Sequence, residues 1–170
     1  MPSLATLSLL DREEFRRVLG GIFEQSSWVA ERAFDAGPFA TVDALHAAMV
    51  DVVHRGSRQE QLALIRAHPD LAGKAARAGT MSASSITEQA TAGLDRLTDD
   101  EYARFERLNA AYREKFGFPF IIAVRRHDKH AILAAFESRL GHGVDEEIEA
   151  ALAQIAEIAR FRLGTLVTER

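Results

Sequence analysis

Cysteine is absent from this chain of 170 residues, and its absence limits the chemistry available. Disulfides, thiolate nucleophiles and zinc or iron–sulfur sites with cysteine ligands are all excluded. Basic residues are not in excess either, because the formal net charge is -4 and the lysines and arginines are scattered. Phosphate backbones are bound by clustered basic side chains, so we expect no nucleic-acid partner.

Long hydrophobic runs are missing as well. None approaches the roughly 18 apolar residues of a membrane-spanning helix, and the first residues lack the basic and apolar regions of a secretion signal. We therefore expect no membrane association and a cytoplasmic location. The composition, 47% hydrophobic and 27% charged, is that of an ordinary globular protein, and its length suits one domain over residues 1–170.

The sequence that remains is mostly patterned at a helical period. Between residues 10 and 23, for example, apolar side chains recur at positions i, i+3, i+4, i+7 and i+8, counted from Phe15. This pattern predicts an all-α, single-domain bundle of about eight helices. The expected helices cover residues 10–23, 28–34, 41–54, 57–67, 85–97, 98–117, 127–140 and 145–166. Residues 70–83 are expected to form a loop or a short irregular helix, and residues 118–124 a buried, partly helical run.

One histidine stands where a helix has to end. His68 precedes Pro69, and a proline ring disfavours the helical conformation of the residue before it. We expect His68 to lie at a break between helices, with an active-site cleft formed around that break. A structural role, in which His68 ends its helix and bonds a backbone carbonyl, stays open. Asp70 could orient His68 or cap the following turn, and capping is favoured.

Glu88 lies near the start of an expected helix and has two interpretations. Ser85 and Glu88 have the Ser-x-x-Glu spacing of a capping box, which Ser57 and Glu60 repeat at the start of an earlier helix. The other interpretation is a ligand site, because a helix N-terminus offers unpaired N–H donors that favour an anion or a carboxylate. Ser85, Glu88 and Gln89 would then bind the ligand together.

Two arginines near the end of the chain are expected to differ in environment. Arg160 and Arg162 are two positions apart, so they cannot share one face of a helix. One is expected to face solvent. The other would point inward, where its planar fork suits carboxylate or imide oxygens.

The six histidines do not form a recognisable metal site. The sequence has no His-Glu-x-x-His motif, and His127 with His130 is the only close pair. We interpret that pair as a solvated helix start. His46, His54 and His142 are interpreted as surface or interface residues.

Several of these residues belong to longer motifs that resemble one enzyme family. The motifs are His68-Pro69-Asp70-Leu71-Ala72-Gly73, Ser85-x-x-Glu88-Gln89-x-x-Ala92-Gly93-Leu94, Leu108-Asn109-x-x-Tyr112-x-x-Lys115-Phe116-Gly117-Phe118-Pro119-Phe120-Ile121 and Arg162-Leu163. In this order, and over nearly the whole chain, they resemble the decarboxylases of 2-oxo-4-hydroxy-4-carboxy-5-ureidoimidazoline (OHCU). That family supplies the last of three enzymatic steps from urate to (S)-allantoin.

The resemblance implies an all-helical, cofactor-free carboxy-lyase without a metal, usually a homodimer, whose partner is the small molecule OHCU. It implies three catalytic residues: His68 as the acid/base, Glu88 and Arg162. The substrate-binding residues it implies are Pro69, Ser85, Gln89, Phe118, Phe120, Ile121, Ile122 and Ala123. Two alternatives remain: a decarboxylase or hydrolase of a related ureido acid, and a non-catalytic helical module that binds a purine breakdown product. Whether Arg160 joins Arg162 in the site also stays open.

Overall fold

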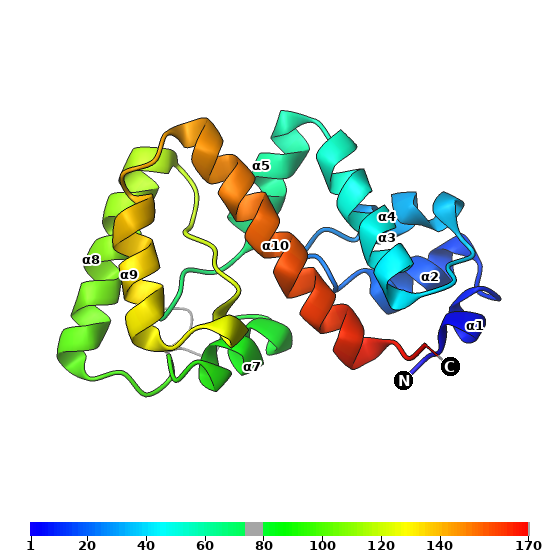
Figure 1. Ribbon diagram of the computed structural model, residues 1–170, viewed down its shortest axis with the longest axis horizontal. Helices are drawn as coiled ribbons and strands as arrows, with labels where there is room; N and C mark the ends of the chain where they lie inside the picture. The colour runs from blue at the N-terminus through cyan, green and yellow to red at the C-terminus, as the bar shows by residue number, and fades with distance from the viewer. Residues whose placement is uncertain (74–79, 170) are drawn as a thin grey trace. The chain divides into compact units, whose positions relative to one another are not determined.

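The computed structural model describes residues 1–73 and 80–169, and their regular secondary structure is almost entirely helical (Figure 1). The only β-type pairing within the two ranges is an isolated bridge between Ser3 and Thr168. The elements are α1 (Leu4–Leu7), α2 (Arg12–Leu19), α3 (Trp28–Ala33), η1 (Phe34–Ala36), α4 (Val42–Arg55), α5 (Arg58–Ala67), α7 (Ala83–Thr91), α8 (Asp99–Phe116), η2 (Val124–Arg126), α9 (Lys129–Arg139) and α10 (Val144–Leu166). The predicted all-α class is confirmed.

Each of the eight expected helices is present, with its ends shifted by a few residues. The largest shift is in α7, which ends at Thr91, because Gly93 adopts a positive φ of 77° and the chain turns away. The four-residue α1 was not expected, since so short a helix has no recognisable period. Among the helices of the described ranges, none is both long enough and apolar enough to cross a membrane.

Two expected irregular segments have different outcomes. The run at residues 118–124 was expected to be buried and only partly helical, and both features are confirmed: it is buried throughout, it has no regular secondary structure as far as Ala123, and Val124 begins η2. Of the expected loop at residues 70–83, residues 74–79 lie outside the described residues. The described part of that loop is not helical until α7 begins at Ala83.

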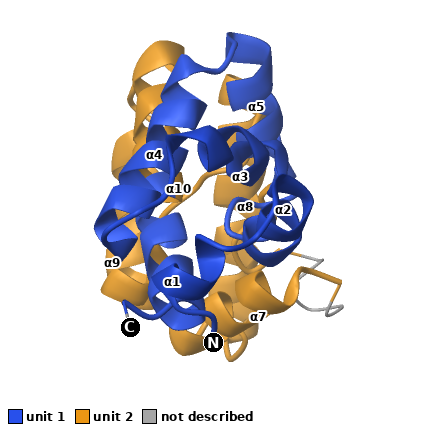
Figure 2. Ribbon diagram, turned by 90° about the vertical axis from the view of Figure 1, so that its right-hand side faces the viewer, with its two compact units in different colours: residues 1–67, 156–170 blue, residues 68–155 orange. Residues whose placement is uncertain are grey.

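The contacts of the chain divide it into two compact units (Figure 2). Unit 1 comprises residues 1–67 and 156–170, and unit 2 comprises residues 68–155. Helix α10 therefore begins in unit 2 and ends in unit 1. That residues 1–170 form one domain stays a prediction.

Unit 1 is built from short helices around an apolar core. Helix α3 packs against both α2 and α4. The completely buried side chains of this core include Leu19, Val29, Leu45, Met49, Leu64 and Ile65. The two ends of the described chain also meet here: Leu4 N–H donates to the Thr168 carbonyl at 3.1 Å, and Thr168 N–H donates to the Pro2 carbonyl at 3.0 Å.

The expected N-caps of α4 and α5 are confirmed. Thr41 Oγ1 accepts a hydrogen bond from Ala44 N–H at 3.0 Å. Ser57 Oγ accepts from Glu60 N–H at 3.1 Å, and Glu60 Oε2 accepts from Ser57 N–H at 3.0 Å, which completes the capping box. These bonds satisfy N–H groups that the first turn of a helix leaves unpaired. Arg32 Nη2 also donates to Glu60 Oε1, at 2.6 Å.

The capping carboxylate makes stability depend on pH. Hydrogen bonds from Arg32 and from Ser57 N–H lower the pKa of Glu60 to about 2. A carboxylate with a lowered pKa in the folded state stabilises the fold above its ordinary pKa and loses that contribution as the pH falls. We expect Glu60→Gln to melt at a lower temperature than wild type at pH 7, and the difference to shrink between about pH 4.5 and 2. Thermal melts across this range test it, with the exposed Glu149→Gln as control. A difference in melting temperature that stays constant down to pH 3 would contradict the lowered pKa of Glu60.

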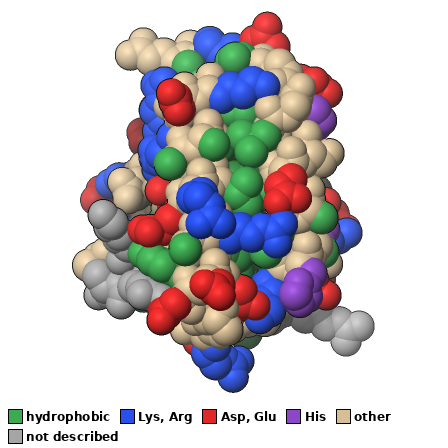
Figure 3. All heavy atoms as spheres, turned by 90° about the vertical axis from the view of Figure 1, so that its left-hand side faces the viewer, with side chains coloured by type: hydrophobic (Ala, Val, Ile, Leu, Met, Phe, Trp, Pro, Cys, Tyr) green, Lys and Arg blue, Asp and Glu red, His purple; other side chains and the backbone are tan. Residues whose placement is uncertain are grey.

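Unit 2 is organised around an aromatic cluster. Helices α8 and α9 pack against each other. The Tyr112 ring lies 4.5–5.9 Å from those of Phe116, Phe118, Phe120 and Phe136, centroid to centroid. Three of these contacts are edge-on, and such contacts add to the free energy gained by burying apolar area. On the face drawn in Figure 3, basic side chains lie among acidic ones. This mixture of charges on the drawn face differs from the continuous basic surface that binds phosphate backbones.

Candidate active site

His68 is the first residue after α5, which ends at Ala67. Leu64 and Ile65 are buried in the last turns of this helix. His68 itself is 6% exposed. The predicted helix break before Pro69 is confirmed, and the predicted cleft around it stays a prediction.

The Gln89 side chain of α7 holds the backbone that follows the His-Pro pair. Its Oε1 accepts from Ala72 N–H at 2.9 Å, and its Nε2 donates to the Asp70 carbonyl at 3.2 Å. Ala72 has a positive φ of 50°. A left-handed conformation costs a residue with a Cβ about 1–2 kcal/mol, so this turn depends on the contacts that hold it.

Helix α8 holds the same turn from a second direction. Asn109 Nδ2 donates to the Leu71 carbonyl at 2.9 Å. Arg113 Nε donates to both carboxylate oxygens of Asp70, at 2.9 and 3.2 Å. Asp70 therefore anchors the turn to α8, a contact that was not expected from the sequence. Because α7 and α8 both bond the turn, the chain next to His68 is fixed by rigid elements.

Helix α7 begins three residues earlier than the spacing of Ser85 and Glu88 suggested. Ser82 is the N-cap, and its Oγ accepts a hydrogen bond from Ser85 N–H at 3.2 Å. The interpretation of Ser85 and Glu88 as a capping box is therefore wrong. Ser85, Glu88 and Gln89 instead lie at positions i, i+3 and i+4 of one helix face, and all three are buried.

The irregular run after α8 carries five more of the residues predicted to bind substrate. We name residues 118–123 the strap. Five strap residues were predicted to bind substrate and are each 5% exposed or less, namely Phe118, Phe120, Ile121, Ile122 and Ala123. Helix η2, which follows directly, packs against α7. The end of the strap is thereby brought close to the helix that carries the buried polar face.

Arg162 lies in unit 1, and Arg160 differs from it as expected. Arg162 is 6% exposed; its Nη1 lies 3.0 Å from Glu24 Oε2 and donates to the Ile22 carbonyl at 3.3 Å. Arg160 is on the solvent side, where its Nε donates to Asp43 at 2.7 Å. The inward arginine is therefore Arg162. Of the predicted catalytic residues, His68 and Glu88 belong to unit 2 and Arg162 to unit 1.

Throughout residues 1–73 and 80–169, no three side chains of histidine, aspartate or glutamate gather as a possible metal site. The helix start predicted at His127 and His130 is confirmed, because Asp128 between them caps α9 by accepting from Ala131 N–H at 2.8 Å.

Comparison with known proteins identifies the family. The family model described as OHCU decarboxylase matches residues 8–164. The chain belongs to the OHCU decarboxylase family. The OHCU decarboxylase of Haloferax volcanii is 44% identical over 162 residues, which cover 95% of this chain and 94% of the relative. The uric acid degradation bifunctional protein PucL of Bacillus subtilis is 41% identical over the whole of this chain, which covers 34% of that protein. The crystal structure of an (S)-allantoin synthase matches with a TM-score of 0.80 and 36% identity, over 99% of this chain and 54% of the other.

Membership of the OHCU decarboxylase family makes the chain a carboxy-lyase of urate degradation. The predicted family and enzyme class are therefore confirmed.

Sequence reasoning missed two buried carboxylates of this OHCU decarboxylase. Glu24 pairs with Arg162, and Glu147, which is 0% exposed, binds Arg139. A weak signal for Glu24 was its place directly after the apolar pair Ile22-Phe23. For Glu147 there was none, since it ends a run of three acidic residues at a helix start, which is typical of a solvated first turn.

Proposed function

We propose that this decarboxylase converts OHCU to (S)-allantoin without a cofactor, with His68 as the acid/base and Glu88 and Arg162 as its polar partners. The observation that carries the proposal is the buried polar face of α7, from which Gln89 bonds the turn that follows His68, in a chain of this family. Hydroxyl, carboxylate and amide groups on one buried face can exchange hydrogen bonds with the polar groups of a small ligand.

The substrate itself supplies the electron sink for the reaction. When the bond to its carboxylate breaks, carbon dioxide leaves, the electron pair forms a double bond to the neighbouring imine carbon, and the imine electrons move onto the ring nitrogen, which takes up a proton from solvent. The hydroxyl then loses its proton as a carbonyl forms, and the ureido-bearing carbon gains a proton on one face. The chain needs to orient the substrate and move these protons.

Each proposed role matches the chemistry of its side chain. His68 would take the hydroxyl proton and direct protonation to one face, which sets the hand of the product. Glu88 would accept hydrogen bonds from ureido N–H groups, and Ser85 would bind beside it. Arg162 would stabilise negative charge on the ring oxygens. Pro69 and the strap would line the plane of the ring. Gln89 supports the turn after His68, and its contact with substrate stays a prediction.

The decisive test is the reaction itself. OHCU is generated in situ from urate by the two preceding enzymatic steps, and circular dichroism follows the appearance of (S)-allantoin. We expect the chain to accelerate formation of the (S) product over the spontaneous route, which gives a racemic product. No acceleration would overturn the proposal and favour a related ureido acid or a binding role.

The substitution Glu88→Gln separates the role of the negative charge of Glu88 from any role of the shape of its side chain. The variant keeps the size and a hydrogen-bonding oxygen but removes the negative charge. We expect turnover to fall about 10²-fold, with the melting temperature within a few degrees of wild type. The control is Glu60→Gln, which weakens a true capping box and should leave turnover unchanged. A fully active Glu88→Gln would remove Glu88 from the mechanism.

A homodimer and a cytoplasmic location are part of the same proposal. Both derive from the family resemblance and from the sequence. Light scattering coupled to size-exclusion chromatography tests the homodimer, with twice the mass of one chain expected.

A further inference from the structure

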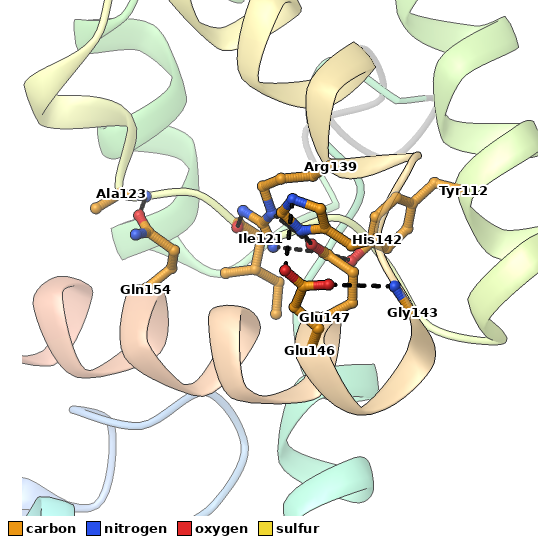
Figure 4. A network of polar contacts seen from close by, with 9 residues as sticks. All are labelled: Tyr112, Ile121, Ala123, Arg139, His142, Gly143, Glu146, Glu147 and Gln154. Carbon is orange, nitrogen blue, oxygen red and sulfur yellow. Dashed lines mark hydrogen bonds and ion pairs between the residues drawn. The ribbon is translucent and has the colours of Figure 1, made fainter.

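Side chains from two helices bond the backbone of the strap, and the Ala123 carbonyl at its end accepts from Arg126 N–H of η2 at 3.3 Å. Arg139 Nη1 of α9 donates to the Ile121 carbonyl at 2.7 Å. Gln154 Oε1 of α10 accepts from Ala123 N–H at 2.9 Å. Figure 4 shows the two contacts approaching the strap from different helices. The path of this segment is thus set by side chains distant from it in the sequence.

Arg139 is itself held by a buried carboxylate. Its Nη2 lies 2.8 Å from Glu147 Oε2, and its Nε lies 3.1 Å from both carboxylate oxygens. Tyr112 donates its hydroxyl to Glu147 Oε2, and His142 Nδ1 lies 2.8 Å from Oε1 (Figure 4). Paired guanidinium and carboxylate groups of this kind have a fixed relative geometry.

The charge of Glu147 persists in spite of its burial. Burial alone would raise the pKa of Glu147, but hydrogen bonds from Arg139 and Tyr112 outweigh it, and the pKa is lowered overall. Removing either partner of a buried charged pair leaves the other uncompensated. The ion pair of Arg139 and Glu147 therefore keeps both side chains in one arrangement.

Arg139 also contacts the strap through a ring. Its guanidinium carbon lies 4.4 Å from the centroid of Phe120. On its other side Phe120 stacks on Phe136 of α9, with centroids 3.9 Å apart and an interplanar angle of 10°. One arginine thus fixes both a backbone carbonyl and the neighbouring aromatic ring.

We infer that Arg139 is a positioning residue of the decarboxylase site, which sets the strap through the Ile121 carbonyl and the Phe120 ring, and that Glu147 fixes Arg139 in that task. The inference rests on the proposed function, in which the strap lines the substrate. A lysine cannot replace this arginine, because a single ammonium cannot bind both carboxylate oxygens, a carbonyl and a ring face together. A shift of about 1 Å in a substrate-positioning group can cost about 10²-fold in rate.

The test combines a measurement without substrate and one with it. Hydrogen exchange of peptides covering residues 118–126 is compared for wild type, Arg139→Met and Arg139→Lys. We expect exchange at least 10-fold faster in Arg139→Met, and an intermediate rate in Arg139→Lys. With OHCU, we expect kcat/KM to fall about 10- to 100-fold in Arg139→Met, with a raised KM.

The control variant is Leu133→Ala, which removes a buried apolar side chain of the same helix. It should lower the melting temperature but leave KM and the exchange of the strap unchanged, because loss of folded protein reduces only the active concentration. If Arg139→Met does not fold, Glu147→Gln, which keeps one acceptor for Arg139, gives the same two measurements.

The inference would be overturned if Arg139→Met showed the hydrogen exchange of the strap and the KM of wild type. If Arg139→Met does not fold, the same result in Glu147→Gln would overturn it. Failure of the wild-type chain to decarboxylate OHCU would overturn the proposed function instead. The two failures are distinguishable because the exchange measurement involves no substrate.

Discussion

His68→Asn is expected to lower the turnover of OHCU by about 10²–10⁴-fold, the range that general acid–base assistance commonly contributes. Asparagine keeps a polar group of similar reach but cannot exchange a proton near neutral pH. The fold should remain, because the turn after His68 is held by Gln89, Asn109 and Arg113, and those contacts do not involve the imidazole.

The measurement is the initial rate of (S)-allantoin formation, together with a thermal melt of each variant. His54→Asn is the matched control, since His54 is exposed in the last turn of α4 and should tolerate the change without loss of rate. Formation of (S)-allantoin by His68→Asn at a near-normal rate would remove His68 from the mechanism.

Arg162→Met is expected to lose both activity and stability. The change leaves the Glu24 carboxylate in unit 1 without its arginine, and breaking a buried charged pair in this way costs about 3–5 kcal/mol. Arg160→Met is the control: its pair with Asp43 is exposed, so the free energy of unfolding should change by about 1 kcal/mol or less, with turnover preserved.

A double variant separates the two losses. Glu24→Gln combined with Arg162→Met removes the buried negative charge along with the positive one, so denaturant unfolding should show that much of the stability returns. Activity should stay lost, because the cation proposed to face the ring oxygens is still missing. If the double variant regains turnover, Arg162 acts only through the fold.

Local patterns predicted most of the helices because their causes are local. The apolar stripe from Phe15, the Thr41 cap and the capping box of Ser57 and Glu60 all depend on residues within one or two turns of each other. The break at His68 belongs to the same class, since a proline restricts its immediate neighbour.

The same local logic failed at α7 because three serines compete there. Ser82, Ser84 and Ser85 can each cap a helix, and only packing within unit 2 decides among them. With Ser82 as the cap, Glu88 is carried into the interior. Spacing alone therefore gave the wrong start for the helix, and the site assigned to these residues stays a prediction.

Buried ion pairs could not be predicted, because their partners come from distant parts of the sequence. Nothing local distinguishes Glu147 from the two acidic residues before it, and only the register of α10 against Arg139 buries it. Glu24 likewise has its ion-pair partner, Arg162, only in the folded unit 1, because the two residues are far apart in the sequence. The roles assigned to His68 and Glu88 came from the family resemblance and not from their spacing.

The discontinuous composition of unit 1 has a consequence for biosynthesis. Its first segment, residues 1–67, leaves the ribosome before all of unit 2, and its second, residues 156–170, only afterwards. At about 5–20 residues per second, the first segment waits roughly 4–18 s for the second. During that interval the nascent chain holds Glu24 without Arg162, and burying an unpaired carboxylate is unfavourable. Unit 2 is continuous in sequence, so all of its residues are synthesised before residues 156–170. Unit 1 can complete its core only after the end of α10 has been translated.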